Sequence, residues 1–323
     1  MILRIPAPQA DAIVGAMRAI ALAHGDGGVT DADRRTIAAA AEIMLGREPG
    51  DADAAPPRTP QQLADAMLDG DDARQAVRLL AVMAVVDGEL DAGKQQLVQE
   101  FADALGVDEP YLEILAEAAR GEIAAATACI MRKNVASFPR LRAAPHLDTD
   151  SLATFLPYRD APDPELEARY RALGALPAGT FGRAFHDHFA RNGFAFPGNP
   201  NGLAEGFTTP HDSSHVLSGY STTQQGELCV STFIGAMHPD HPMSAEVLPV
   251  LFSWHLGIKL TDVAGAYRGA FEPRRFWTAW DRGAAVTTDV VAPDWDFWGA
   301  TEVELEELRR AYGVPPVAPD LLC

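Results

Sequence analysis

Two histidines, an aspartate and a glutamate fall within residues 209–227 of the sequence. His211 and His215 are four residues apart, so on a helix both side chains lie on one face. Asp212 lies about a quarter-turn round the same helix, and Glu227 follows a short turn. Two imidazoles and two carboxylates form an N2O2 ligand set, which suits Zn²⁺ or another first-row divalent ion such as Mn²⁺ or Fe²⁺. The four side chains are therefore candidate metal ligands, and candidate catalytic residues acting through the metal.

A helix–turn–helix corner is needed to bring these side chains together. Thr209 suits the cap of the first helix and Pro210 its first position, while Gly219 is well placed to end it in a left-handed conformation. Thr222 then opens a second helix with a capping box, which places Glu227 in its second turn. A histidine pair at this spacing also occurs on a solvated face or inside a core, where it binds nothing. The neighbouring carboxylates and caps favour the metal interpretation.

The same stretch resembles a known family. The spacing H-D-x-x-H, eleven further residues and E, with G-Y-x-T-x-x-x-G between, resembles the metal motif of the fourth coenzyme Q biosynthesis protein family. Residues 176–182 and 192–194 resemble the segment that opens this family's domain. Residues 294–296 and 304–314 resemble its closing D-W-E segment and final helix. The resemblance covers roughly the C-terminal half, with His211, Asp212, His215 and Glu227 at the ligand positions.

The resemblance implies an aromatic substrate that carries a polyprenyl chain, and loss of the ring carboxylate at the position that is then hydroxylated. The implied activity is that of a metal-dependent lyase (decarboxylase) or an oxidative decarboxylase of a ubiquinone precursor, and oxidation would need a redox-active ion or oxygen. The metal would hold a carboxylate or phenolate and stabilise the charge that develops as carbon dioxide leaves. The implied partners are a biosynthetic enzyme complex, a second copy of the chain in a homodimer, and a membrane surface.

Two other functions stay open. The C-terminal half could bind a prenyl lipid without catalysis and serve as a scaffold for biosynthetic enzymes. The adjacent His211 and Asp212 also occur in metal-dependent phosphohydrolases, although that class needs further distant ligands. A related reaction on another terpenoid or polyketide is a variant of the first hypothesis.

Apolar helices are expected after Glu227, over residues 228–237 and 244–260. Residues 247–256 are apolar almost all round, which is typical of a central core or of the wall of a cavity for a long apolar ligand. The candidate lining residues of such a cavity are Leu228, Val250, Phe252, Trp254 and His255. His238 and His241 are expected on the surface, and His188 on the surface or supporting the site.

The N-terminal half contains an internal duplication. Residues 8–46 and 73–107 each predict two helices joined by an Asp-Gly turn, at Asp26 in the first copy and Asp87 in the second. Residues 84–90, A-V-V-D-G-E-L, resemble the hallmark of the TerB-like helical domains of tellurite resistance. Ala92 and Val98 exclude an EF-hand, so the aspartates are expected to cap or turn between helices.

We therefore expect an all-α fold with two helical domains, since only residues 286–291 have any strand character. In this expectation, residues 1–138 form a domain that resembles the TerB-like domains and contains the duplication, residues 139–163 form a proline-containing linker, and residues 164–323 form the metal-binding domain that resembles the coenzyme Q biosynthesis family.

Composition limits the possible partners. A net charge of −19 argues against nucleic-acid binding and against long-range attraction to anionic lipid. No apolar run is long enough to span a membrane, and the first residues lack the order of a secretory signal. The three widely spaced cysteines, Cys129, Cys229 and Cys323, are expected to be reduced. These features predict a cytoplasmic protein, with peripheral contact at the inner face of the cell membrane as an option.

Overall fold

A computed structural model describes residues 7–25, 28–48, 50, 54–66, 70–142, 162–260 and 265–323. These residues contain helices, turns and two isolated β-bridges, but no strand or sheet. Residues 286–291, the one stretch with strand character, form turns and bends. The expected all-α fold is confirmed.

The N-terminal half consists of helices that follow the predicted duplication. Its helices are α1 (Ala7–Leu22), α2 (Asp31–Ile43), α4 (Pro60–Ala66), α5 (Gly70–Met83), α6 (Ala92–Leu105), α7 (Pro110–Ala119) and α8 (Ile123–Ser137). Thr30 caps α2 with a capping box, and Asp91 caps α6. Gly88 lies in the second Asp-Gly turn with φ of 79°. The first such turn, at Asp26, lies outside the described residues.

A buried ion cluster joins the two copies of the duplication. Lys94 is fully buried on α6, and its Nζ lies 2.6 Å from Asp33 Oδ1 on α2 and in contact with Asp87. Thr30 Oγ1 donates a further hydrogen bond to Asp87 Oδ1 at 2.6 Å. Asp87 therefore does more than form a turn, because its carboxylate accepts from both copies.

The C-terminal half carries the candidate site. Its elements are α9 (Pro139–Arg142), α10 (Pro164–Ala172), η2 (Leu173–Ala175), α11 (Phe181–Asn192), α12 (Glu205–Ser218), α13 (Gln224–Met237), η3 (Pro242–Val247), α14 (Leu248–Val250), η4 (Leu251–His255), α15 (Pro273–Ala285), α16 (Phe297–Ala300), α17 (Leu305–Ala311) and η5 (Pro319–Leu321). The predicted helix over 244–260 is in fact two π-helical turns, η3 and η4, with α14 between them. The predicted linker begins with α9, and residues 143–161 lie outside the described part.

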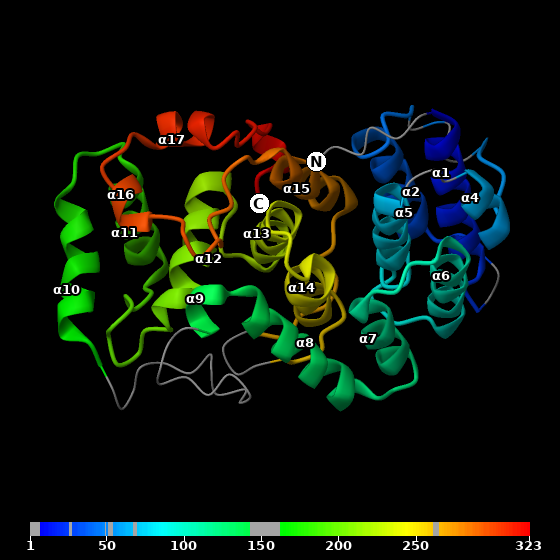
Figure 1. Cartoon of the computed structure of the whole chain (residues 1–323), viewed down its shortest axis with the longest axis horizontal. Helices are drawn as coiled ribbons and strands as arrows, with labels where there is room; N and C mark the ends of the chain where they lie inside the picture. The colour runs from blue at the N-terminus through cyan, green and yellow to red at the C-terminus, as the bar shows by residue number, and fades with distance from the viewer. Residues whose placement is uncertain are drawn as a thin grey trace.

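One hydrophobic cluster of the described residues contains side chains from both sequence halves. It includes Ile13 and Leu80 from the first half and Phe252 and Trp277 from the second. Helix α15 lies between α13 and α2 in Figure 1, so it connects the site-bearing helices to the N-terminal ones. The division into two domains stays a prediction from the sequence.

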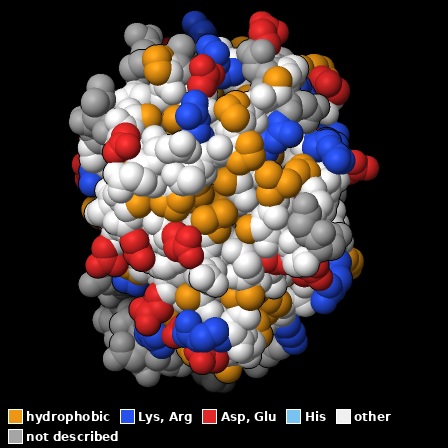
Figure 2. Space-filling view, turned by 90° about the vertical axis from the view of Figure 1, so that its right-hand side faces the viewer, with side chains coloured by type: hydrophobic (Ala, Val, Ile, Leu, Met, Phe, Trp, Pro, Cys, Tyr) orange, Lys and Arg blue, Asp and Glu red, His pale blue; other side chains and the backbone are white. Residues whose placement is uncertain are grey.

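The side of the molecule on which the helices of the N-terminal half lie (Figure 1) carries both charges. Figure 2 shows acidic and basic side chains interspersed around a band of hydrophobic ones on this side. None of the described helices combines the length and apolar character that crossing a membrane requires.

Candidate metal centre

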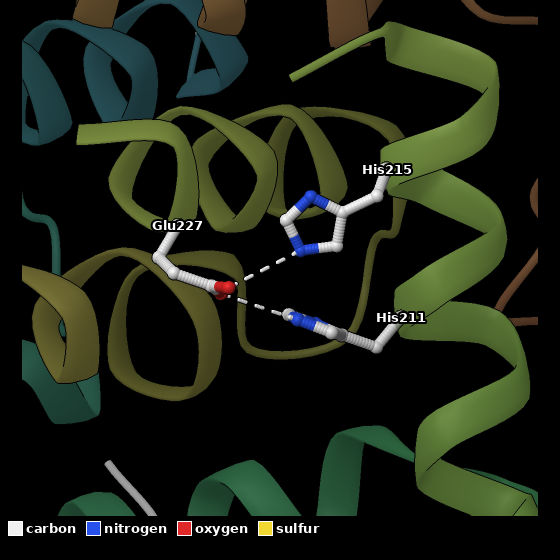
Figure 3. A group of neighbouring side chains, drawn as sticks. All are labelled: His211, His215 and Glu227. Carbon is white, nitrogen blue, oxygen red and sulfur yellow. Dashed lines mark ion pairs between the residues drawn. The ribbon is translucent and has the colours of Figure 1, made fainter. Parts of the chain in front are cut away.

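Three of the four predicted ligands converge between α12 and α13. His211 Nε2 lies 3.4 Å from Glu227 Oε2, and His215 Nε2 lies 3.4 Å from Glu227 Oε1. One ligand atom from each residue lies within 4.8 Å of the other two. In Figure 3 both rings project from α12 toward the carboxylate on the facing helix. This arrangement is a candidate His₂Glu metal site.

The turn that positions these residues agrees with the sequence in one respect and differs in two. Gly219 ends α12 at φ of 83°, as predicted. The helix begins earlier than predicted, at Glu205, so Pro210 lies inside it and Thr209 is not its cap. Thr209 instead shares a hydrogen bond of 2.6 Å with the hydroxyl of Tyr170.

The second helix, α13, begins one residue later than predicted. Thr223, and not Thr222, caps α13 by accepting a hydrogen bond from the Gly226 backbone amide at 3.2 Å. Glu227 nevertheless lies near the start of α13, where a carboxylate is favoured by the positive end of the helix dipole.

The position of the proton on His215 follows from its surroundings. His215 Nδ1 lies 2.9 Å from the Tyr220 carbonyl oxygen, which can only accept, so Nδ1 carries the hydrogen. In the neutral ring Nε2 therefore presents a lone pair. This atom is buried, has no hydrogen-bond partner in the described part of the chain, and faces the Glu227 carboxylate. Two facing lone-pair donors in a buried place require a cation or a proton between them.

The electrostatics of the cluster lead to the same requirement. Burial by itself would raise the pKa of Glu227, but the His215 and His211 rings hold that pKa well below its ordinary value. Burial by itself would lower the pKa of His211, but contact with Glu227 raises it to about 9. Without a metal the cluster keeps a proton on His211. A divalent ion would displace that proton, so the donor set fits a metal.

Asp212 does not join the three converging ligands. Its Oδ1 lies 2.8 Å from His188 Nε2 on α11, and both side chains are buried. The His188 ring stacks on the ring of His215 at 5.3 Å between centroids. His188 thus supports the site, which was one of the two roles expected for it. Asp212 anchors His188 and is not part of the candidate cluster.

A cavity of about 610 Å³ borders the candidate site. His211 and Glu227 contribute to its wall, which is otherwise largely apolar and includes Met131, Phe194, Phe207, Val250, Trp254 and Leu260. Of the predicted lining residues, Val250 and Trp254 face this cavity. The other three do not belong to the wall: Leu228 and Phe252 are buried in the core, and His255 borders a separate cavity.

Glu246 is a wall residue that the sequence did not single out. It lies on the π-helix η3, is 2 % exposed, and has its Oε1 2.8 Å from Ser137 Oγ. Ser137 Oγ also lies 2.9 Å from the Asn134 carbonyl oxygen, but its hydroxyl has a single hydrogen. The Ser137 hydroxyl therefore donates to either the Glu246 carboxyl oxygen or the Asn134 carbonyl oxygen at one time. Burial raises the pKa of Glu246 to about 7, although the hydrogen bond from Ser137 opposes this. In the sequence, the feature that could have identified Glu246 as a candidate site residue is its position as a lone glutamate within an apolar run.

The prediction that His238 lies on the surface is wrong. Its side chain is buried, and Nδ1 lies 2.7 Å from Asp289 Oδ2. Burial alone would lower the pKa of His238, but the contact with Asp289 raises it. The partner is 51 positions away in the sequence, so local spacing gave no sign of it.

Compared with models of known protein families, the chain matches none, and no curated protein matches it at a significant level. The fold and site by themselves define an all-α protein with a candidate His₂Glu metal centre beside an apolar cavity.

Proposed function

We propose that this protein binds a polyprenylated aromatic carboxylate and removes its ring carboxylate at a divalent metal, as a ubiquinone-biosynthesis-like decarboxylase. The observation that carries this proposal is the convergence of His211, His215 and Glu227 on the wall of an apolar cavity. Zn²⁺ is the first candidate ion, and Mn²⁺ and Fe²⁺ are alternatives.

The metal would be held by these three residues, a ligand number that leaves coordination positions for substrate or water. When bound, it would supply a Lewis acid for a carboxylate or phenolate oxygen of the substrate. His215 is oriented for this task because the Tyr220 carbonyl fixes Nδ1–H and leaves Nε2 as the donor. Stacking of His188 on His215 holds that ring further in place.

The cavity supplies the binding energy for an apolar substrate. Its volume is within the range of about 300–1,000 Å³ that is typical of sites enclosing a small molecule. Phe194, Trp254 and Leu260 offer apolar surface for a prenyl chain and limit access of water to the ring. Transfer of such a chain from water contributes about 25 cal/mol per Å² of buried apolar area.

Glu246 would complete a decarboxylation in which hydrogen replaces the carboxylate. The carbon–carbon bond breaks, carbon dioxide leaves, and the electron pair stays on the ring carbon. That carbon takes the proton of the Glu246 carboxyl group, and the resulting carboxylate is reprotonated from water. A pKa of about 7 suits this role, because Glu246 can then give up and regain a proton near neutral pH.

A non-catalytic lipid-binding scaffold is the second candidate, since the apolar cavity would serve it equally well. A hydrolase has less support, because in the described residues Asp212 turns to His188 and no further distant ligand joins the cluster. Membership of an enzyme complex, a homodimer and a peripheral membrane contact remain proposals that follow from the family resemblance alone.

The test combines native mass spectrometry with a turnover assay. The purified protein is analysed for metal and co-purified lipid, then incubated with a prenylated 4-hydroxybenzoate labelled in the carboxyl group. We expect labelled carbon dioxide from the wild type and none from His215→Ala. Lipid binding by the wild type without release of the label would favour the scaffold. Cleavage of a generic phosphoester with added Mn²⁺ would favour the hydrolase.

A further inference from the structure

A second cavity, of about 400 Å³, lies where the two sequence halves meet. Its wall comes from α2, from the loop after α5, from the end of η4 and from residues 268–273. Figure 1 shows α2 and α15 side by side in this region. The residues of its wall that matter here are Arg35, Asp87, Gly88, His255, Arg268 and Phe271.

Two arginines border this cavity without a carboxylate partner. Arg35 bonds through Nε to the Asp31 carbonyl oxygen at 3.4 Å, and its terminal nitrogens have no partner within the described ranges. The Arg268 side chain has neither a hydrogen bond nor an ion pair there. The neighbouring Arg34, by contrast, pairs with Asp31 at 2.8 Å. In a chain of net charge −19, two unpaired guanidinium groups at one cavity indicate a site for an anion.

His255 adds a requirement for a hydrogen-bond donor. Its Nε2 lies 3.2 Å from the Val86 carbonyl oxygen, so Nε2 carries the hydrogen and Nδ1 presents a lone pair. Burial lowers the pKa of His255, which keeps the ring neutral at pH 7. Nδ1 is buried without a partner in the part of the chain described. A ligand with an O–H or N–H group would satisfy it.

The rest of the wall is compatible with an anion. Asp87 is its acidic member, but its carboxylate accepts from Thr30 and is paired with Lys94. Phe271 contributes an apolar surface and packs against the His255 ring at 5.3 Å between centroids.

We propose that this cavity binds a protonated phosphate group, for which HPO₄²⁻ is the simplest case. The Arg35 and Arg268 guanidinium groups match phosphate oxygens in charge and geometry, and the P–OH group donates to His255 Nδ1. The site is separate from the metal centre and does not depend on the function proposed for it. The phosphate could be free in solution or belong to a lipid headgroup.

Calorimetric titration of the full chain with inorganic phosphate at pH 7 tests this proposal. We expect saturable binding at one site, weakened at least about tenfold in Arg35→Gln and in Arg268→Gln, since each substitution removes a charged hydrogen-bond donor to the phosphate. Arg34→Gln is the matched control, because Arg34 is adjacent on α2 but does not line the cavity, and its affinity should be unchanged. Sulfate, which has similar size and charge but no proton at this pH, should bind at least about tenfold more weakly than phosphate.

Both cavity arginines are exposed, so their variants are expected to fold, which thermal melting checks. Sedimentation with phosphatidylcholine vesicles containing phosphatidic acid separates the two sources. Binding to these vesicles that Arg268→Gln abolishes, without binding of free phosphate, would assign the group to a lipid. The proposal is overturned if the wild type binds neither probe, if Arg34→Gln weakens binding as much as Arg35→Gln, or if sulfate binds as tightly as phosphate.

Discussion

Two of the buried charged clusters in the described part of the chain differ in one component. Lys94 with Asp33 and Asp87 forms the first, between the two helix pairs of the N-terminal half. The candidate metal centre on α12 and α13 is the second. The first includes its own cation, whereas the second places two imidazoles and a carboxylate around a position with no permanent positive charge.

In the first cluster the negative charges are neutralised by a cation of the protein itself, whereas the second cluster lacks such a permanent cation among the described residues. The Lys94 ammonium group contacts both carboxylates, and Thr30 donates to one of them. In the second cluster His215 Nε2 has no partner within the described ranges, and the wall opens on a cavity. The first is therefore expected to stabilise the fold alone, and the second to become complete when a cation binds.

The largest effect is expected from removing the built-in cation. Lys94→Met leaves Asp33 and Asp87 buried without compensation, which should lower the free energy of unfolding by about 3–5 kcal/mol in urea denaturation. His215→Ala in metal-free protein should cost less, because Glu227 keeps His211 as a partner. A loss below about 1 kcal/mol in Lys94→Met would contradict the structural role of the first cluster.

Glu246 is a buried carboxyl group at which burial outweighs the nearby histidines, so its pKa is raised. Its pKa is about 7 in the folded state, against 4.5 for the ordinary group. Because the folded state binds this proton more tightly, stability falls as pH rises from 4.5 through 7, by about 3 kcal/mol for a shift of this size.

Glu246→Gln should remove that pH dependence. Denaturation curves at pH 5 and pH 8 measure it, with Glu302→Gln, an exposed glutamate, as the control that keeps the wild-type behaviour. An unchanged difference between the two pH values in Glu246→Gln would show that this group is charged in the folded protein.

Zinc affinity should depend on pH through His211, whose pKa is about 9. Below that pH a bound metal must displace one proton, so affinity should rise about tenfold per pH unit, or about 1.4 kcal/mol, and level off above pH 9. Competition with a chromophoric chelator at pH 6, 7 and 8 measures the slope. If both histidines had ordinary pKa values, the zinc affinity would instead level off near pH 6.5.

The smallest effect is expected at Asp212. Asp212→Asn preserves the shape of the side chain, and we expect zinc affinity to fall less than about tenfold, because Asp212 bonds to His188 and to none of the three converging ligands. His211→Ala should lower the affinity at least about 100-fold under the same conditions. Equal losses in the two variants would restore Asp212 as a fourth ligand, as the sequence motif predicts.

The sequence could predict those parts of the site that depend on local geometry. His211 and His215 share a helix face because they are four apart, and Gly219 ends that helix because glycine adopts positive φ freely. These two facts are enough to turn the chain so that Glu227 faces the imidazoles.

The features that the sequence did not predict depend on distant partners or on irregular helix. Asp212 turns toward His188, which lies 24 positions earlier, and no spacing rule indicates that contact. Glu246 lies on a π-helical turn, whose period differs from the 3.6 residues used to assign faces. Pro210 suggested a helix start, yet the helix begins a turn before it, at a cost of one backbone hydrogen bond.

The most direct test of the central claim is the metal content of the purified full chain, measured by inductively coupled plasma mass spectrometry alongside His215→Ala. We predict about one divalent ion per chain in the wild type and none in the variant, with helix content by circular dichroism unchanged in both. A wild-type protein that stays free of metal after incubation with zinc, or a variant that retains the ion, would contradict the assignment of the second cluster as a metal centre.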